Sequence, residues 1–203
     1  MTKSKTMTRT AAALAIASSL GLAGLAGCSS EGTPEDTTLS DAEVLGALVT
    51  ANQGEIQYSQ MGADEAQDIE VKGFAAKLVL EHGVALAHVR GVANDANLPA
   101  TDSGVSISLQ EEEKNEEVDL QGAQNRGTDF DLRFLCGQIR LHKNLIETID
   151  ASLTPSAGDN RVRDEVAGMR PHVTDHLQEA RDLTVKLAAG ATVEATCQDR
   201  GGS

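Results

Sequence analysis

Four segments of the chain repeat apolar residues with the period of an α-helix, about 3.6 residues. Helices are predicted from Ser40 to a break near residues 62–68, over about 66–97, from Thr128 to about 149, and over about 160–189. The chain has three Phe, one Tyr and no Trp, so its interior must be built mainly from Leu, Val, Ile and Ala. Such an interior favours helices packed on helices, and an all-α fold is predicted.

The connections predict how these helices are joined. "SDAE", which starts at Ser40, is a capping-box pattern, and Thr128 or Asp129 can cap the third helix. The third and fourth helices are separated by the turn "LTPSAGDN" (153–160), whereas the second and third are joined by residues 98–127. Two helical hairpins with so long a connection between them indicate a ferritin-like four-helix bundle, with a long crossover between helices two and three.

The N-terminus has the three parts of an export signal. A basic region with Lys3, Lys5 and Arg9 is followed by a stretch rich in Ala and Leu and then by small residues. The sequence "LAGC", ending at Cys28, resembles the bacterial lipoprotein cleavage box, in which the cysteine carries the lipid. We therefore expect a signal peptide over 1–27, a lipid-anchored tether over 28–39, the bundle over 40–190 and a C-terminal tail over 191–203. The protein would be exported and anchored to the cell envelope, and Ser29 after the cysteine favours the periplasmic face of an outer membrane in a two-membrane bacterium.

Charge limits the classes of partner. Without residues 1–27 the chain has 31 acidic and 14 basic side chains, a balance that repels phosphate backbones and argues against nucleic-acid binding. The expected partner is the membrane, to which the lipid anchor would attach the protein. The sequence does not indicate a protein partner. The acidic run from Glu111 to Asp119 is interpreted as a solvated face, such as that of a short surface helix.

Four fragments together resemble a known family. They are "NQGEIQYSQMGADEA", "FAAKLVLEHGVALAHVRGVANDANLP", "GTDFDLRFLCGQIRLHKNLI" and "MRPHVTDHLQEARDL". Over roughly residues 40–188 the chain resembles the ferritin-like bacterial envelope family called domain of unknown function 4142. The resemblance implies an exported helical domain with no assigned activity. The positions that match the family's pattern are Glu55, Glu81 with His82, Asp131 with His142, and Pro171 with His176 and Leu177.

Each predicted helix has one polar residue in the centre of its apolar stripe. These residues are Glu55, His82, His142 and His176, and the predicted connectivity places them within about two helical turns of one another along the bundle. His172, one turn before His176, is an additional candidate. Because a buried polar group without a partner costs about 1–3 kcal/mol, these side chains should meet one another, a water or an ion.

Three hypotheses follow for this set. A ferritin-type di-iron centre is disfavoured, because that site uses Glu-x-x-His motifs and residue 79, three before His82, is Val. A single transition-metal ion, Cu, Zn or Fe, fits two or three His with a carboxylate. The protein would then bind or buffer metal in the envelope. The alternative is a metal-free buried His/Glu network in a structural or interaction lipoprotein.

Enzymatic chemistry has little support in the sequence. The segment "HVTDH" (172–176) has Val where the zinc-peptidase motif needs its general-base Glu. No pairing of a nucleophile with a base is visible elsewhere, so a catalytic role is not predicted. Pro171 predicts either a kink or the start of a new helical segment.

Two cysteines remain once Cys28 is assigned to lipid. Cys136 lies off the core stripe of the third helix, and Cys197 lies about two helical turns of length beyond the fourth. In the oxidising envelope they can form a disulfide that folds the tail back onto the third helix, or remain independent thiols.

Overall fold

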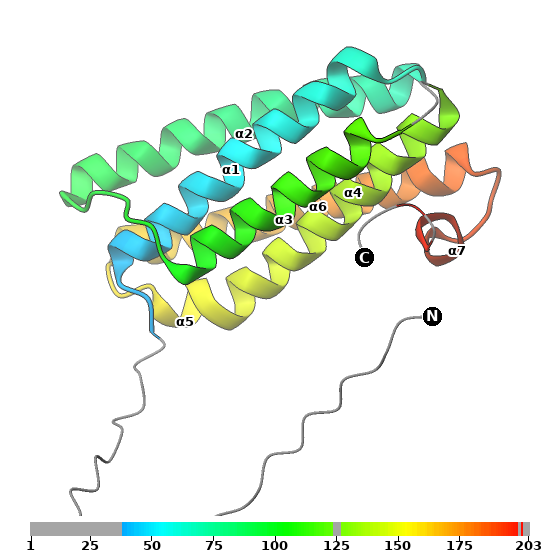
Figure 1. Cartoon of the computed structure of the whole chain (residues 1–203). Helices are drawn as coiled ribbons and strands as arrows, with labels where there is room; N and C mark the ends of the chain where they lie inside the picture. Colours follow the sequence, from blue (N-terminus) through cyan, green and yellow to red (C-terminus); the bar gives the residue numbers. More distant parts are fainter. Residues whose placement is uncertain (1–37, 124–126, 199, 201–203) are drawn as a thin grey trace, which may run out of the picture. The chain divides into compact units, whose positions relative to one another are not determined.

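The structure is a bundle of helices packed side by side (Figure 1). The computed structural model describes residues 38–123, 127–198 and 200, so the predicted signal peptide, Cys28 and most of the tether lie outside the described residues. The long helices are α1 (Asp41–Glu65), α2 (Ile69–Ala96), α3 (Gly104–Gln121), α4 (Thr128–Thr148) and α6 (Asn160–Leu187). Short helical pieces are η1 (Ile149–Leu153), α5 (Thr154–Ser156) and α7 (Val193–Cys197). The prediction of an all-α helical bundle is confirmed.

Polar side chains fix where most of these helices begin. Ser40 and Glu43 form the predicted capping box at the start of α1, and Asp68 and Asp159 accept backbone N–H groups at the starts of α2 and α6. The prediction for the third helix was wrong, because α4 has Gly127 at its N-cap position with no side-chain cap.

The connection between the second and third predicted helices is itself mostly helix. α3 packs against α1 and α4 along the bundle and closes the side between them (Figure 1). Its buried residues include Glu113 and Glu116, 7% and 8% exposed. The interpretation of Glu111 to Asp119 as only a solvated surface was therefore wrong, since two of these carboxylates face the bundle.

The turn before the fourth helix is shorter than the sequence predicts. Helical structure continues from α4 through η1 and α5 as far as Ser156, so only residues 157–159 separate it from α6. α6 runs from Asn160 to Leu187 with Pro171 inside it. Pro171 is exposed, so the carbonyl that loses its hydrogen-bond partner lies on the solvated side.

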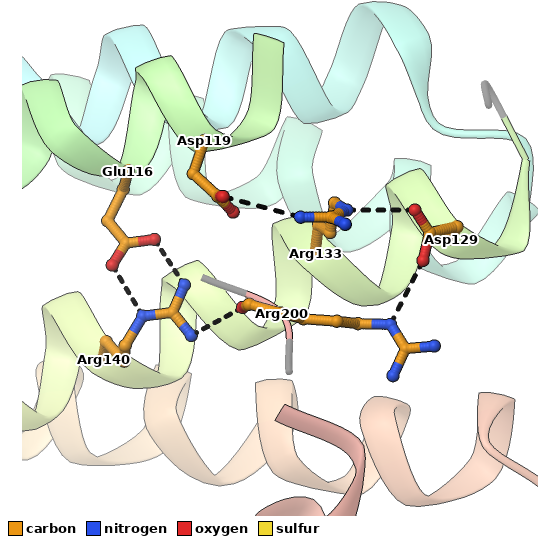
Figure 2. A network of polar contacts seen from close by, with 6 residues as sticks. All are labelled: Glu116, Asp119, Asp129, Arg133, Arg140 and Arg200. Carbon is orange, nitrogen blue, oxygen red and sulfur yellow. Dashed lines mark hydrogen bonds and ion pairs between the residues drawn. The ribbon is translucent and has the colours of Figure 1, made fainter. Parts of the chain in front are cut away.

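The C-terminal segment is fastened to α4. A disulfide joins Cys136 to Cys197, with the two Cα atoms 5.4 Å apart. Arg140 on α4 donates two hydrogen bonds to Glu116 of α3, at 2.6 and 2.5 Å, and a third to the Arg200 carbonyl at 2.9 Å. Figure 2 shows how this network continues, with Arg200 bound to Asp129 and Arg133 placed between Asp129 and Asp119. The described part of the predicted tail therefore belongs to the same compact unit as the bundle.

A layer of polar side chains divides the apolar core. One cluster contains the start of α1 and the end of α4, with Leu48 and Ile149 among its members, and the other lies toward the opposite end, with Tyr58 and Phe130. Between the two clusters lie Asn52, Glu55, His82, Gln138, His142 and His176, all buried. No helix in the described ranges is long and apolar enough to cross a membrane.

The close approach of α1 and α4 gives a testable prediction. A methyl group on Gly137 would overlap the hydroxyl of Tyr58, whereas a methyl group on Gly73 of α2 would meet nothing within 4 Å. We expect Gly137→Ala to lower the free energy of unfolding by about 1–3 kcal/mol through overpacking. Gly73→Ala should raise it by about 0.5–1 kcal/mol, because Ala is the better helix former. Urea denaturation measures both, and equal effects at the two positions would contradict the packing described.

Candidate metal centre

Three buried histidines from three helices meet in the polar layer. His82 of α2, His142 of α4 and His176 of α6 are 4%, 0% and 3% exposed. Their ring centroids are 5.2 to 5.7 Å apart, and one ring nitrogen from each lies within 4.8 Å of the other two. In the described part of the chain this is the one group of three or more His, Cys, Asp or Glu residues with such a spacing.

The hydrogen atom of the His82 ring is placed by Asn52. The amide nitrogen of Asn52 donates to the Leu48 carbonyl at 2.7 Å, which leaves its Oδ1 facing His82 Nδ1 at 3.0 Å. Because that oxygen only accepts, Nδ1 carries the hydrogen and Nε2 has a free lone pair. Nε2 is buried and has no hydrogen-bond partner among the described residues.

His142 is held in the corresponding way by α4 and α1. Its Nδ1 lies 3.1 Å from the Gln138 carbonyl, one turn earlier, and 3.3 Å from Glu55 Oε1. Nδ1 therefore donates, and Nε2 is left with its lone pair. Nε2 points at Nδ1 of His176, 3.3 Å away.

His176 completes the group with the help of α2. Its Nε2 lies 2.5 Å from Glu81 Oε2, and because a carboxylate accepts, Nε2 carries the hydrogen. In the neutral ring the lone pair is then on Nδ1, opposite the lone pair of His142. Each of the three imidazoles thus has one nitrogen on an oxygen acceptor and the other directed into the group, which is how metal-binding histidines are usually held.

Protonation of these rings is opposed by their surroundings. Burial and the neighbouring His176 lower the pKa of His82 to about 3, and burial with the two other imidazoles lowers the pKa of His142 well below its usual value. Burial also lowers the pKa of His176, although the bond to Glu81 opposes that shift. At neutral pH the group therefore presents lone pairs.

The geometry suits one transition-metal ion. Ligand nitrogens bound to zinc lie about 2.0–2.1 Å from the metal, so tetrahedral ligation separates them by about 3.4 Å. His142 and His176 already meet this spacing at 3.3 Å, and His82 needs only a modest shift to join them. A water molecule in the same place has two hydrogens for three lone pairs, whereas a metal ion accepts all three.

The structure brings together three of the five candidate residues. Glu55 lies behind His142, on its Nδ1 side, and so supports a candidate ligand instead of joining the three nitrogens. His172 is exposed and lines a pocket of about 530 Å³ between α2 and α6 that also reaches His82 and His176.

The supporting residues were not identified as such from the sequence. Asn52 and Glu81 orient their rings through side chains, but single polar residues on a helix usually face solvent. Gln138 acts through its backbone carbonyl, which no side-chain pattern reveals. The one signal for Glu81 was its position beside His82 in the family pattern. Asp131 in the same pattern has a structural role, because its carboxylate accepts the backbone N–H groups of Gln67 and Asp68 at the start of α2.

Two buried carboxyl groups lie on the α3 side of the centre. Burial raises the pKa of Glu55 to about 8, although a hydrogen bond with Gln138 opposes the shift. Burial and the nearby Glu55 raise the pKa of Glu113 to about 10. Glu113 lies over Gly54, where a side chain would collide with its carboxyl group. Both groups are therefore expected to be mainly protonated at neutral pH.

Glu113 gives a prediction about stability and pH. A raised pKa means that the folded state prefers the neutral carboxyl, so this contribution is complete below about pH 4.5 and is lost as the pH rises toward 10. Glu113→Gln cannot ionise, and its free energy of unfolding should fall less between pH 5 and 9. At pH 8 we expect the variant to be more stable by about 1–3 kcal/mol, since each pKa unit is worth about 1.4 kcal/mol and partial solvation reduces the total.

Glu111→Gln is the matched control, because Glu111 lies on the same helix and is exposed. It should follow the wild-type pH profile in thermal or urea unfolding. A Glu113→Gln profile parallel to that of the wild type would show that Glu113 is ionised in the folded protein.

Comparisons with known proteins place the chain in a family. No curated protein and no solved structure matches it. A family model described as "Domain of unknown function (DUF4142)" matches residues 26–183. The match covers most of the 203 residues, including all three histidines of the centre. The chain therefore belongs to the family called domain of unknown function 4142.

Proposed function

We propose that this protein binds a single transition-metal ion through His82, His142 and His176. The observation that carries the proposal is the direction of three lone pairs. His142 Nε2 and His176 Nδ1 lie 3.3 Å apart, His82 Nε2 is buried without a partner among the described residues, and one nitrogen of each ring lies within 4.8 Å of the other two. The opposite nitrogen of each ring is held by an oxygen acceptor. Such an arrangement orients ligands before the metal arrives.

The metal-free network is the weaker alternative. A network that serves only to organise the core should pair its donors with its acceptors. Here two lone pairs, on His142 and His176, face each other at 3.3 Å, and His82 Nε2 has no partner among the described residues. A bound metal ion would accept the lone pairs of all three rings, so none would face another lone pair or lack a partner.

The ligand set indicates the class of metal. Imidazole suits Zn, Cu and Fe, and three neutral histidines leave at least one coordination position for another ligand. Thiolate ligation is not expected, because Cys136 and Cys197 form a disulfide. Glu81 would act through His176 as the carboxylate of a carboxylate–histidine–metal arrangement.

We further propose that the protein works at the cell envelope as a lipoprotein. Support comes from the order of a basic region, an apolar region and "LAGC" before Cys28. The tether would hold a metal-binding domain near the membrane, where it could buffer or sequester metal outside the cytoplasm.

Metal titration of stripped protein tests the centre. We expect wild type to bind one Co(II) or Zn(II) tightly, and to melt at a higher temperature with metal than with chelator, because an ion that binds only the folded state stabilises it. His82→Ala, His142→Ala and His176→Ala should each lower the affinity by more than about 100-fold, beyond the loss typical of supporting residues. Calorimetry and thermal melting measure these changes.

Two further variants separate ligation from general damage. His172→Ala is the control and should keep the affinity of the wild type, since His172 lies outside the group. Asn52→Leu, which removes the acceptor for His82 Nδ1, should cost about 10–100-fold. If the wild type binds no metal stoichiometrically, the buried network is metal-free.

Lipidation has its own test. The wild type, expressed with its N-terminal segment in a bacterium, should partition into the detergent phase of Triton X-114, because acyl chains on Cys28 bury many methylene groups. Cys28→Ser should stay in the aqueous phase, whereas Ser29→Ala should behave like the wild type. Equal partitioning of the wild type and Cys28→Ser would exclude an anchor at this cysteine.

A further inference from the structure

All five histidines of the chain lie at the centre or along one pocket. His142 is in the centre, and the other four, His82, His88, His172 and His176, line the pocket between α2 and α6. His82 and His176 are buried at its inner part, while His88 and His172 are exposed. Both exposed histidines therefore line the same pocket as two of the three buried ones.

His88 is held much as the buried histidines are. Its Nδ1 lies 2.5 Å from Glu165 Oε2, so α2 and α6 are joined across the pocket at this point. The Glu165 side chain is only 7% exposed, whereas that of His88 is 71% exposed. With Nδ1 on a carboxylate, the Nε2 lone pair of neutral His88 is free for a ligand that comes from solvent.

Three polar residues of the pocket follow one another at intervals along α6. With a rise of about 1.5 Å per residue, Glu165 lies about 10 Å from His172 along the helix axis, and His172 about 6 Å from His176. The walls between them are apolar and include Val84 of α2 and Val173 of α6. Metal ligands therefore recur at intervals from the outer part of the pocket to the centre.

The charge of the pocket favours cations. Three carboxylates, Glu81, Asp164 and Glu165, line it, and no lysine or arginine does so in the described part of the chain. A concave surface lined by one sign of charge raises the local concentration of the opposite ion.

We propose that this pocket is the route by which a transition-metal ion reaches the centre, and that His88 with Glu165, followed by His172, holds the ion on the way. The proposal rests on the metal-binding function above. It adds a second, outer set of metal-holding residues that act on the rate of loading.

Gly168 allows the route to be blocked without breaking the fold. It lines the pocket on α6, and a β-carbon added there meets nothing within 4 Å. In Gly168→Phe, stopped-flow absorption should show Co(II) association slowed about tenfold or more, as expected when access to a buried site is gated. Dissociation should slow by the same factor and Kd should be unchanged, because a barrier changes both rates equally.

Gly73→Phe is the matched control. Gly73 lies on α2, is equally open to a new side chain and does not line the pocket. This variant should load at the wild-type rate. Loading of Gly168→Phe at the wild-type rate would overturn the route, whereas absence of Co(II) binding by the wild type would contradict the proposed function and remove the route with it.

A separate experiment tests whether His88 and His172 hold the ion on its way to the centre. The double variant His88→Ala/His172→Ala should load about tenfold more slowly at low Co(II), with unchanged stoichiometry, because local capture of the ion is lost. In His142→Ala, whose centre lacks a ligand, substoichiometric Cu(II) should still broaden the imidazole NMR signals of His88 and His172. Unchanged loading by the double variant, or unbroadened signals, would overturn the holding role.

Discussion

A buried neutral imidazole presents one N–H group and one lone pair, and both need partners once water is excluded. In this bundle the N–H groups of His82, His142 and His176 are satisfied by Asn52, the Gln138 carbonyl and Glu81. Asn52 joins α1 to α2 and Glu81 joins α2 to α6, so these pairings fix how the three helices are rotated and shifted against one another. The Gln138 carbonyl lies on the same helix as His142, and Glu55 of α1 provides the contact of that ring with a second helix. The remaining lone pairs of His142 and His176 lie 3.3 Å apart, and the group of three rings could hold a metal ion.

The buried polar groups extend from the layer to α3, the fifth long helix. Glu55, on α1, lies behind His142, and α3 closes that side of the bundle with Glu113 and Glu116. These two carboxylates are accommodated in different ways. Glu116 is paired with Arg140 through two hydrogen bonds, whereas burial and the nearby Glu55 raise the pKa of Glu113 to about 10, so a neutral carboxyl group is expected there. A neutral carboxyl group needs no cationic partner, so Glu113 can stay buried near Glu55.

The apolar periodicity was sufficient to predict α1, α2, α4 and α6, because these helices bury regular stripes. It did not predict the packing of α3, since the sequence from Glu111 to Asp119 is almost uniformly charged and only the tertiary structure shows that Glu113 and Glu116 turn inward. The three histidines were predicted because a polar residue is conspicuous in an apolar stripe. Asn52 was missed because it lies outside the apolar stripe of its helix, and Gln138 was missed because it holds His142 through its backbone carbonyl, which side-chain patterns do not reveal. The position of Glu55 depends on the direction of its side chain, which the helical period does not resolve.

The bundle combines a firmly held side with a more open one. α4, which carries His142, is linked to the C-terminal segment by the Cys136–Cys197 disulfide and to α3 by the Arg140–Glu116 pair (Figure 2). α2 packs mainly on α1 and contacts α6 less extensively, and the pocket opens between α2 and α6. His82 and His176 lie on these two helices. The ring held on α4 can therefore stay in place, while a small shift of α2 would bring His82 to the spacing that His142 and His176 already have.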